Sequence, residues 1–410
     1  VVLATASGSG FSTLGGTSLT TWDDSGASGL RFYVRDLDSG EFWSPGRPAD
    51  PEAAEIQAHW SPGIFTLGHT ENGLRTSMEI CVLADRPAEL RRITVTDLSG
   101  TARHLDVTSL AEIVLNQADA HAAHPAFSKL FLQTQYVEDR RSLLVSRRPR
   151  DPHDRHPILV HSILENGEVE FETDRARFHG RGRPAQSPAA LQSTDPLSAT
   201  TGNVLDPVVS LRRKISLAPG QSTSMTFLLG AAADEMAARA MATGLNNQGA
   251  LEDAFAAARS AAEGQLTSLG ISARDHSHAQ QLAAAMLRGD SRLRADSASF
   301  SRVAGNPADL DRLGIDPHLP LAVVRGDGDT IERMRLIFRA WRALNLSHQL
   351  VVLADEIEPE GSESGLVHLK PGRLTAAELD LLAATAALMV TESLPDPAAL
   401  VPPVPPATVA

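Results

Sequence analysis

Hydrophobic and polar residues alternate in short runs along the first 232 residues of the chain. Clear examples are residues 30–35, 74–82 and 89–96, and Gly, Pro, Asp and Ser separate the runs. A period of two is typical of strands that bury one face and leave the other in solvent. Many short strands with turn residues between them favour a β-sandwich or barrel over a βαβ sheet. Residues 97–100, which lie between two such runs, are predicted to form a hairpin loop.

The spacing of hydrophobic residues becomes helical after residue 232. Residues 233–302 are rich in alanine, and glycines at positions 244 and 270 divide them into two or three predicted helices. We interpret this part as a helical linker. Residues 393–410 are rich in proline and lack any periodic pattern, so they are predicted to be a linker tail.

A third pattern occupies residues 303–392. Residues 319–324 and 349–354 are short apolar strands with a helical segment, 330–344, between them. A strand, a crossover helix and a second strand predict a parallel pair. A last helix is predicted over residues 375–390, because its first residues have a capping-box sequence. The expected fold class is therefore α+β: a large antiparallel β-sandwich followed by a helical linker and a small α/β unit.

Composition narrows the classes of partner. The 410 residues carry a formal net charge of −13, which argues against a protein that binds nucleic acid through its phosphates. Cys81 is the single cysteine, so no internal disulfide can form, and its alternating neighbours predict a buried position in a strand. No stretch approaches the ~20 apolar residues that span a bilayer, so direct membrane insertion is not expected. Because the sequence starts in a strand-like run without Met, we expect a piece of a longer protein.

Glycines near the N-terminus invite comparison with a phosphate-binding loop. They are Gly8, Gly10, Gly15 and Gly16. Such a loop needs a helix that opens directly behind it, whose amides hold the anion. The residues that follow are β-branched and polar, so a flexible loop of the sandwich is expected instead, and no cofactor is predicted.

Two groups of histidines are candidates for metal ligands. Asp119, His121 and His124 have a spacing compatible with a metal, but the sequence supplies no further ligand, so a polar loop is favoured and no metal is predicted. The second group is expected to lie in a solvated loop: His153, His156 and His161.

Charged and aromatic residues form two candidate carbohydrate sites. Arg35 and Asp36 precede Trp43. Guanidinium and carboxylate groups bind sugar hydroxyls in pairs, whereas the alternative is a buried ion pair that orders the end of a strand, which we favour. The same choice applies to residues 174–183, in which the candidates are Asp174, Arg175 and Arg181. No catalytic pair of carboxylates, serine-hydrolase elbow or zinc-protease helix can be assigned.

The sequence FYVRDLDSGEFWSP at residues 32–45 resembles a signature of the N-terminal β-sandwich of glycoside hydrolase family 94, formerly glycosyltransferase family 36. The resemblance is most specific at HPAFSKLF, residues 124–131, which adds His124 to the binding or interface candidates. It covers roughly residues 1–370. Further matching segments are 89–96, 110–115, 173–182 and 202–208.

The resemblance implies a galactose-mutarotase-like supersandwich of the version found inside cyclic β-1,2-glucan synthases. In that family the catalytic residues lie on a helical barrel that follows, so the implied function is a non-catalytic carbohydrate-binding or scaffolding module in β-glucan synthesis. A purely structural spacer and a fragment of an active β-glucoside phosphorylase remain as alternatives. The implied partners are a β-glucan oligosaccharide, neighbouring catalytic domains of the same polypeptide and a second copy in a homodimer. The implied location is cytoplasmic, within an inner-membrane protein.

Overall fold

The computed structural model describes most of the chain as two compact units, residues 1–261 and 262–406. The described residues are 2–4, 10–21, 29–49, 55–151, 154–183, 187–287, 289–295, 300–303, 305–344, 346–355 and 363–396. Of the features discussed above, Gly8, His153 and the tail beyond residue 396 lie outside them. The units divide inside a helix at residue 261, and each is described by itself.

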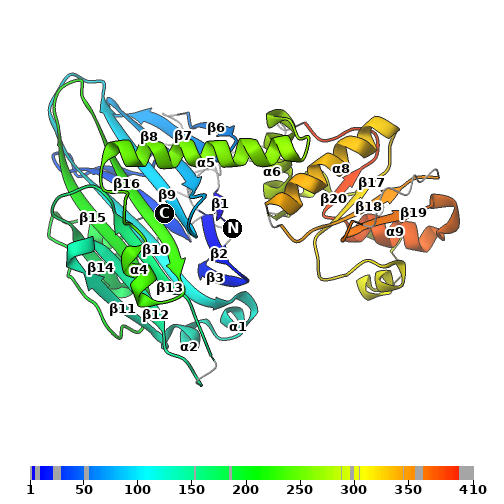
Figure 1. The fold of residues 1–410 in the computed structure, drawn as a ribbon, viewed down its shortest axis with the longest axis horizontal. Helices are drawn as coiled ribbons and strands as arrows, with labels where there is room; N and C mark the ends of the chain where they lie inside the picture. The colour runs from blue at the N-terminus through cyan, green and yellow to red at the C-terminus, as the bar shows by residue number, and fades with distance from the viewer. Residues whose placement is uncertain are drawn as a thin grey trace. The chain divides into compact units, whose positions relative to one another are not determined.

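The first unit contains two eight-stranded sheets whose strands pair antiparallel (Figure 1). The first sheet has the order β1 (Val2–Ala4), β2 (Gly10–Leu14), β3 (Thr17–Thr20), β10 (Arg103–Gln117), β15 (Pro207–Leu217) and β14 (Glu170–Asp174), with β4 (Leu30–Asp36) on β10 and β5 (Phe42–Trp43) on β4. The second has the order β11 (Leu132–Val137), β12 (Ser142–Arg147), β13 (Ile158–Ile163), β16 (Ser222–Ala232), β9 (Ala88–Asp97), β8 (Leu74–Val82), β7 (Ile64–Glu71) and β6 (Gln57–Ser61).

Alternation along the strands fills the space between the sheets. Phe32 and Val34 of β4 pack into the same core as Met225 and Phe227 of β16. The intervening residues of β4 point to the other face of the first sheet, where α3 (Arg175–His179) and the chain up to β15 cover them. All seven residues of β4 are consequently buried. Because both faces of β4 are covered, its charged residues are buried as well.

The antiparallel sandwich predicted from the alternation is confirmed, but one turn prediction is wrong. Residues 98–102 do not close a hairpin, because β9 belongs to the second sheet and β10 to the first. Asp97 organises this crossing by accepting hydrogen bonds from the amides of Ser99, Gly100 and Gly220. Turn residues specify that the chain reverses, whereas the neighbours available to each strand decide with which strand it pairs.

Of two smaller predictions for the sandwich, the buried position of Cys81 is confirmed, whereas the flexible loop at the N-terminal glycines is wrong where the structure describes it, because Gly10–Leu14 and Thr17–Thr20 are strands joined by a tight turn. Gly15 and Gly16 have φ values of 54° and 82° in the turn between β2 and β3, and no helix starts there. Such positive φ values at both central residues suit a tight hairpin. Cys81 is buried in β8, and burial raises the pKa of its thiol to about 12.

Short helices decorate the sandwich. The chain continues from β10 through α1 (Ala118–Ala123) and α2 (Pro125–Lys129). After β16 come α4 (Glu235–Ala240) and the long α5 (Gln248–Ser268). Phe255 of α5 joins the apolar cluster on the outer face of the second sheet, and its ring lies 4.4 Å from the guanidinium of Arg92. The predicted helices of residues 233–302 are thus present, with α6 (Ala273–Leu287) in the second unit.

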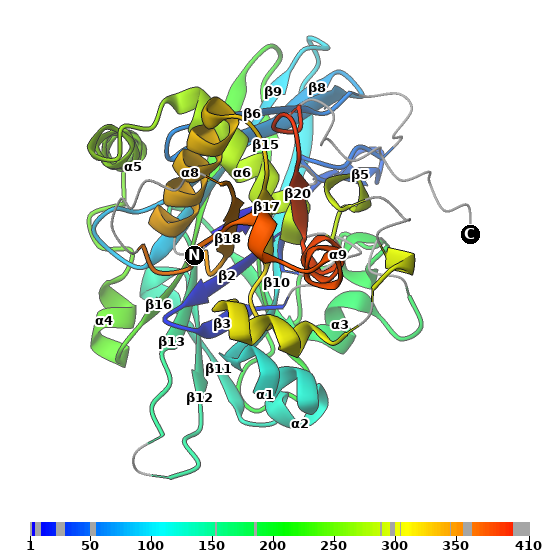
Figure 2. The same ribbon diagram turned by 90° about the vertical axis from the view of Figure 1, so that its right-hand side faces the viewer.

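The second unit is built on a parallel sheet in the order β19 (Leu366–Leu369), β18 (Gln349–Leu353), β17 (Leu321–Val324) and β20 (Leu388–Val390). Helices α6 and α8 (Gly328–Ala343) cover one face and α9 (Ala376–Thr385) the other (Figure 2). Short 3₁₀ helices are present in both units, at Glu138–Arg140, Ala189–Leu191, Ser291–Leu293, Pro307–Leu313 and Pro371–Arg373.

The predicted parallel pair of β17 and β18, joined by a crossover helix, is confirmed. The capping box of Thr375 and Glu378 is also present. However, the helix that it opens ends at Thr385, and residues 388–390 form the strand β20 rather than helix. A run of three apolar residues after an apolar helix carries no periodicity of its own, so only the packing against β17 reveals the strand.

Candidate functional site

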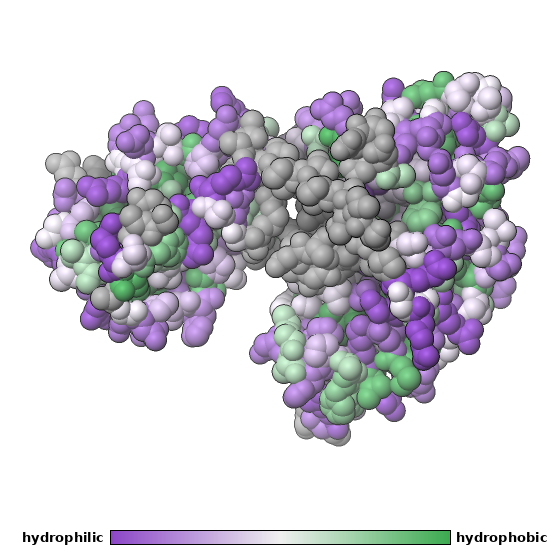
Figure 3. Space-filling model, turned by 180° about the vertical axis from the view of Figure 1, so that it is seen from behind, coloured by the Kyte–Doolittle hydropathy of each residue, from purple (hydrophilic) through white to green (hydrophobic). Residues whose placement is uncertain are grey.

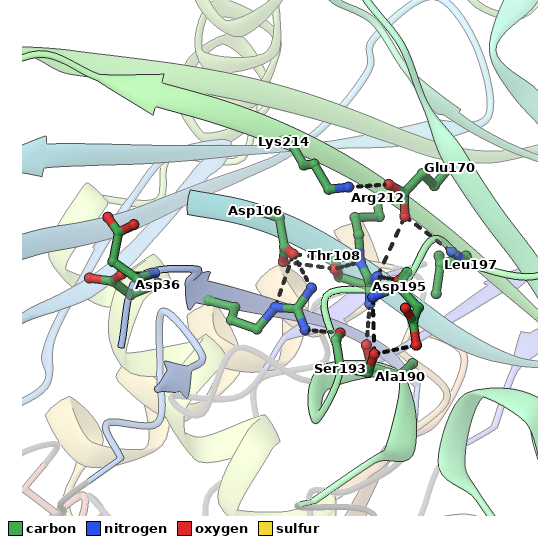
Figure 4. A network of polar contacts seen from close by, with 12 residues as sticks. Asp36, Asp106, Thr108, Glu170, Ala190, Ser193, Asp195, Leu197, Arg212 and Lys214 are labelled. Atoms are coloured by element: carbon green, nitrogen blue, oxygen red, sulfur yellow. Dashed lines mark hydrogen bonds and ion pairs between the residues drawn. The ribbon is translucent and has the colours of Figure 1, made fainter. Parts of the chain in front are cut away.

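Asp106 and Arg212 lie in a buried ion network on the covered face of the first sheet (Figure 4). Arg35 belongs to the same network. Its guanidinium donates to the Asp106 carboxylate, with the Nε–Oδ2 distance at 3.0 Å. Arg212 lies 3.8 Å from the same carboxylate and donates through Nε to Thr108 at 2.9 Å. The side chains of Arg35, Asp106 and Arg212 are at most 2% exposed. Removing one member would leave an uncompensated charge in the interior.

The network fastens the segment between α3 and β15 onto the sheet. Arg35 donates to the carbonyl oxygen of Ser193. Arg212 donates to the carbonyl oxygens of Ala190 and Asp195, at 2.5 and 3.3 Å. Glu170 accepts from the amide of Leu197 at 3.1 Å, as Figure 4 shows. The guanidinium of Arg35 is therefore occupied by internal partners.

Asp36 and Trp43 also make internal contacts. The Asp36 carboxylate accepts from Arg103 at 3.0 Å and from the amide of Asp38 at 2.9 Å. Trp43 is 3% exposed, and its indole Nε1 donates to Thr76 of the opposite sheet at 2.9 Å. The structure thus buries this first group of candidates and gives them internal partners, the arrangement that the ion-pair interpretation describes.

Arg175 occupies a different setting, at a partly exposed group that we call the Glu112 cluster. Arg175 Nε donates to Glu112 Oε1 at 3.2 Å, and its backbone amide donates to the carbonyl oxygen of Asp206 at 3.0 Å. Lys129 donates to Asp206 Oδ1 at 2.5 Å. Arg31 Nη2 lies 3.7 Å from Glu112 Oε1. The cluster consists of Arg31, Glu112, Lys129, Arg175, His179 and Asp206.

Exposure falls from the rim of the Glu112 cluster to its floor. The side chains of Arg175 and Asp206 are 40% and 39% exposed, whereas that of Glu112 is 14% exposed. At the floor, His179 is 4% exposed, and neither ring nitrogen has a hydrogen-bond partner. Burial and, to a smaller extent, the charges of Arg175 and Arg31 lower the pKa of His179 to about 4. Arg31 Nε and Nη2 also lack hydrogen bonds.

Four segments that carry the family resemblance meet at this cluster. Glu112 lies in residues 110–115, Lys129 in 124–131, His179 in 173–182 and Asp206 in 202–208. Sequence reasoning selected Arg175 among these residues but missed its neighbours, although the matching segments contained them. Alternation predicts which residues share a face of one strand, but it does not predict which loops and helices meet there.

The remaining candidates lie apart from those contacts or support them locally. Asp174 caps α3 by accepting from the amide of Ala176 at 2.8 Å. Arg181 follows Gly180 in an exposed turn. His124 is exposed at the junction of α1 and α2. None of these three residues belongs to the Glu112 cluster.

Close to His124 along the chain, Phe127 and Leu130 are 55% and 44% exposed, and elsewhere Leu205 is 81% exposed. Three guanidinium groups surround the neighbouring Phe131 ring at 5.3–5.9 Å. They belong to Arg147, Arg148 and Arg150. Hydrophobic side chains also show in green at the lower end of the first unit in Figure 3.

The histidines behave differently from one another. Within the described residues, no three His, Cys, Asp or Glu side chains gather in an arrangement that could hold a metal. His156 lies 2.8 Å from Asp154. His161 contradicts the prediction of a solvated loop, because it is fully buried in β13. Its ring bridges the carbonyl oxygen of Leu228 and the hydroxyl of Ser109, at 3.0 and 2.7 Å. The strand pattern of residues 158–163, rather than the charges nearby in the sequence, indicates that His161 is buried.

Comparisons with known proteins place the sandwich among carbohydrate-active enzymes. Residues 1–248 match the family described as "Glycosyl hydrolase 94, supersandwich domain". The chain is 30% identical over 366 residues to the cyclic beta-(1,2)-glucan synthase NdvB of Rhizobium meliloti (strain 1021), covering 86% of this chain and 13% of that protein. It is 26% identical over 227 residues to a solabiose phosphorylase of Paenibacillus borealis, covering 55% and 29%. The chain thus spans a minor part of both relatives.

The comparison with solved structures matches, among others, a putative kojibiose phosphorylase from the human microbiome and a bacterial glucoamylase complexed with acarbose. The first has a TM-score of 0.34 and 7% identity over 61% of this chain and 28% of its own. The second has a TM-score of 0.37 and 11% identity over 60% and 32%. Among the described residues, no helix is long and apolar enough to cross a membrane.

Proposed function

Since this chain belongs to glycoside hydrolase family 94 through its supersandwich domain, we propose that it is a non-catalytic module of a β-glucan-synthesising or phosphorolysing enzyme. In this role the sandwich binds and guides a glucan chain and supports neighbouring catalytic domains of the same polypeptide. The partners that we propose are a β-glucan oligosaccharide, those domains and a second copy of the chain. We place the module in the cytoplasm as part of an inner-membrane protein.

The observation that carries glucan binding is the Glu112 cluster. Carboxylate, guanidinium and imidazole groups from four segments that resemble the family lie there, and their side chains range from 40% exposed to buried. Sugar hydroxyls both donate and accept hydrogen bonds, so they suit a site that offers both kinds of group. The relatives that support the choice of sugar are a cyclic beta-(1,2)-glucan synthase and a solabiose phosphorylase.

A supporting role for the sandwich follows from its internal charges. Arg35, Asp106 and Arg212 hold the outer segment against the first sheet. Such buried contacts fix one arrangement of sheet and cover, because any other leaves charges without partners. We infer that this rigidity holds the ends of the module in a constant geometry for its neighbours. A purely structural spacer is the second candidate, and the internal placement of Arg35, Asp36 and Trp43 favours it.

A catalytic role is not proposed. A glycosidic acid needs a carboxyl group with a raised pKa and a second carboxylate across the scissile bond. Glu165 has a pKa raised by burial, but both of its oxygens accept from the backbone amide of Thr226 at 2.8 Å. This carboxyl group therefore serves the local fold between β13 and β16.

Isothermal titration of the chain with linear β-1,2-gluco-oligosaccharides tests glucan binding. We expect saturable heat at millimolar sugar, and no heat with the same concentration of glycerol, which offers hydroxyls without a ring. Absence of heat with the glucan would leave the structural spacer as the function.

A second assay tests the absence of catalysis. The chain is incubated with glucose 1-phosphate and an acceptor oligosaccharide, and released phosphate is measured. We expect no release above the buffer rate. Release by the chain alone would identify an active phosphorylase and overturn the proposal.

A further inference from the structure

We propose that the Glu112 cluster is a subsite for one pyranose ring of a neutral saccharide, in which His179, Arg31 and Glu112 bind neighbouring hydroxyl groups. The inference rests on the proposed glucan binding and names its site and its mode of recognition. It assigns a role to buried polar atoms that the fold leaves without hydrogen-bond partners, namely both ring nitrogens of His179 and the Nε and Nη2 groups of Arg31.

The buried ring of His179, which has no hydrogen-bond partner, lowers the stability of the fold. A buried polar group without a hydrogen bond costs about 1–3 kcal/mol. The adjacent Phe178 is fully buried and already fills the apolar space under α3, in contact with Leu191 and Val208. The imidazole ring lies 5.4 Å from the Phe178 ring. An apolar side chain would therefore serve the packing at position 179 better than histidine does.

The protonation state of His179 suits a hydroxyl group. Burial and the nearby Arg175 and Arg31 lower its pKa to about 4, so at neutral pH the ring offers one N–H donor and one acceptor nitrogen. A sugar hydroxyl can use either, because it both donates and accepts. A fully ionised phosphate oxygen only accepts, so it would leave the acceptor nitrogen unused.

Arg31 and Glu112 complete a donor–acceptor pair. The Nε and Nη2 groups of Arg31 lie on one edge of the planar guanidinium, and neither makes a hydrogen bond. Glu112 accepts from Arg175 at 3.2 Å and lies 3.7 Å from Arg31, and its side chain remains 14% exposed. A carboxylate has about four acceptor positions, so it can take further donors. Neighbouring hydroxyls of a pyranose ring match this pairing: one donates to the carboxylate while the next accepts from the guanidinium.

The charged side chains of the cluster are mostly paired with one another. Its three cationic side chains, Arg31, Lys129 and Arg175, face the two carboxylates of Glu112 and Asp206. Glu112 lies within 4 Å of all three cations. A phosphate or a carboxylate ligand placed directly beside Glu112 would be repelled by this carboxylate, although the cluster as a whole carries one net positive charge. A sugar ring carries no charge and avoids this repulsion.

Two substitutions on α3 form a matched test. Arg175→Gln removes a guanidinium that contacts Glu112, whereas Arg177→Gln removes an exposed guanidinium on the same helix that pairs only weakly, at 3.7 Å, with Asp174. His179→Phe keeps the ring and removes both nitrogens. Binding of linear β-1,2-gluco-oligosaccharides is measured by calorimetry, and the melting temperature is measured without ligand.

We expect at least tenfold weaker glucan binding from His179→Phe, which removes a binding group, and from Arg175→Gln, which removes the guanidinium that positions Glu112. Arg177→Gln should bind like the original chain. We also expect His179→Phe to raise the melting temperature, because it removes a buried group without a partner. The gain in stability shows that a loss of binding does not come from unfolding.

Three results would contradict the inference. Glucan binding that persists in both the Arg175→Gln and His179→Phe variants would move the subsite elsewhere and leave the proposed function intact. No glucan binding by the original chain would refute both. Binding of inorganic phosphate or glucose 1-phosphate that His179→Phe abolishes, with no response to the neutral glucan, would identify an anion site instead.

Discussion

The burial and the partners of a single charged residue depend on which part of its strand another segment covers. Arg35 and Arg31 belong to the same strand and the same face, yet Arg35 lies deep in the Asp106 network and Arg31 reaches the partly exposed Glu112. The chain from residue 187 onward covers the first and provides its carbonyl partners. One arginine is thus enclosed by the covering segment, and the other contributes to the Glu112 cluster.

Replacing Asp106 with Asn should destabilise the first unit by about 3–5 kcal/mol, because two buried guanidinium groups would lose their shared carboxylate. Urea unfolding, followed by circular dichroism, measures the change. The matched control is Asp38→Asn, whose exposed carboxylate faces His104 at 3.3 Å and should contribute less than about 1 kcal/mol. Equal effects of the two changes would show that the network is not essential for stability.

His161 should make stability fall on the acidic side of neutrality. Its Nδ1 donates to a carbonyl oxygen, so Nε2 accepts from Ser109, and the ring must stay neutral. Burial lowers its pKa to about 4 from the ordinary 6.5. The unfolded chain therefore binds a proton first as the pH falls. The stabilisation is complete above about pH 6.5 and is lost towards pH 4, by roughly 3 kcal/mol in total.

Measuring the free energy of unfolding between pH 7 and pH 4 tests this expectation. His161→Gln should flatten the slope of stability against pH in that window. Replacement of the exposed His104 by Gln serves as the control and should keep the slope. A slope unchanged by His161→Gln would show that other groups cause the acid sensitivity.

At some positions two paired strands lie so close together that only glycine fits between their backbones. Gly68 of β7 lies opposite Ser77 of β8. A Cβ atom at Gly68 would lie 2.4 Å from the carbonyl oxygen of Thr76 and 2.9 Å from the Cα of Ser77. Neither atom can move without shifting β8. By contrast, a Cβ at Gly264 in α5 would meet nothing within 4 Å. The strand therefore requires glycine, while the helix tolerates it.

Gly68→Ala should destabilise the sandwich by about 1–3 kcal/mol through overpacking. Gly264→Ala should stabilise the chain by about 0.5–1 kcal/mol, because alanine is the better helix former. Thermal unfolding of the two variants compares the same chemical change in two settings. Stabilisation by Gly68→Ala would contradict the close approach of β7 and β8.

At the scale of the whole molecule, the chain has separate cores in its two units. Phe32 and Phe227 lie in the core of the sandwich, and Ile337 and Trp341 lie in a core of the second unit. Trp341 further donates through its indole nitrogen to the carbonyl oxygen of Ala279 at 2.7 Å, which ties α8 to α6. Each unit therefore buries its own apolar surface.

We expect two unfolding transitions in differential scanning calorimetry. Asp106→Asn should lower the temperature of one, and Trp341→Ala, which empties a large buried volume in the second unit, should lower that of the other. Conversely, one transition that both substitutions shift equally would show that the units unfold together.

The sequence was sufficient wherever a local pattern has a local cause. Alternation predicted the sandwich strands, and the capping residues Thr375 and Glu378 predicted where α9 begins. Each of these features depends on residues within one or two turns of the chain. The family segments also named the parts of the chain that meet at the Glu112 cluster, but not the contacts between them.

Only the tertiary structure decided which polar residues are enclosed in the fold and which remain partly exposed to solvent. The strand β20 needed β17 beside it, and residues 98–102 cross between sheets because β9 and β10 found different neighbours. Arg35 and Arg175 look alike in sequence. A covering segment encloses the first, whereas the second stays at the rim beside Glu112. Burial and pairing depend on residues distant along the chain, so no local pattern contains them.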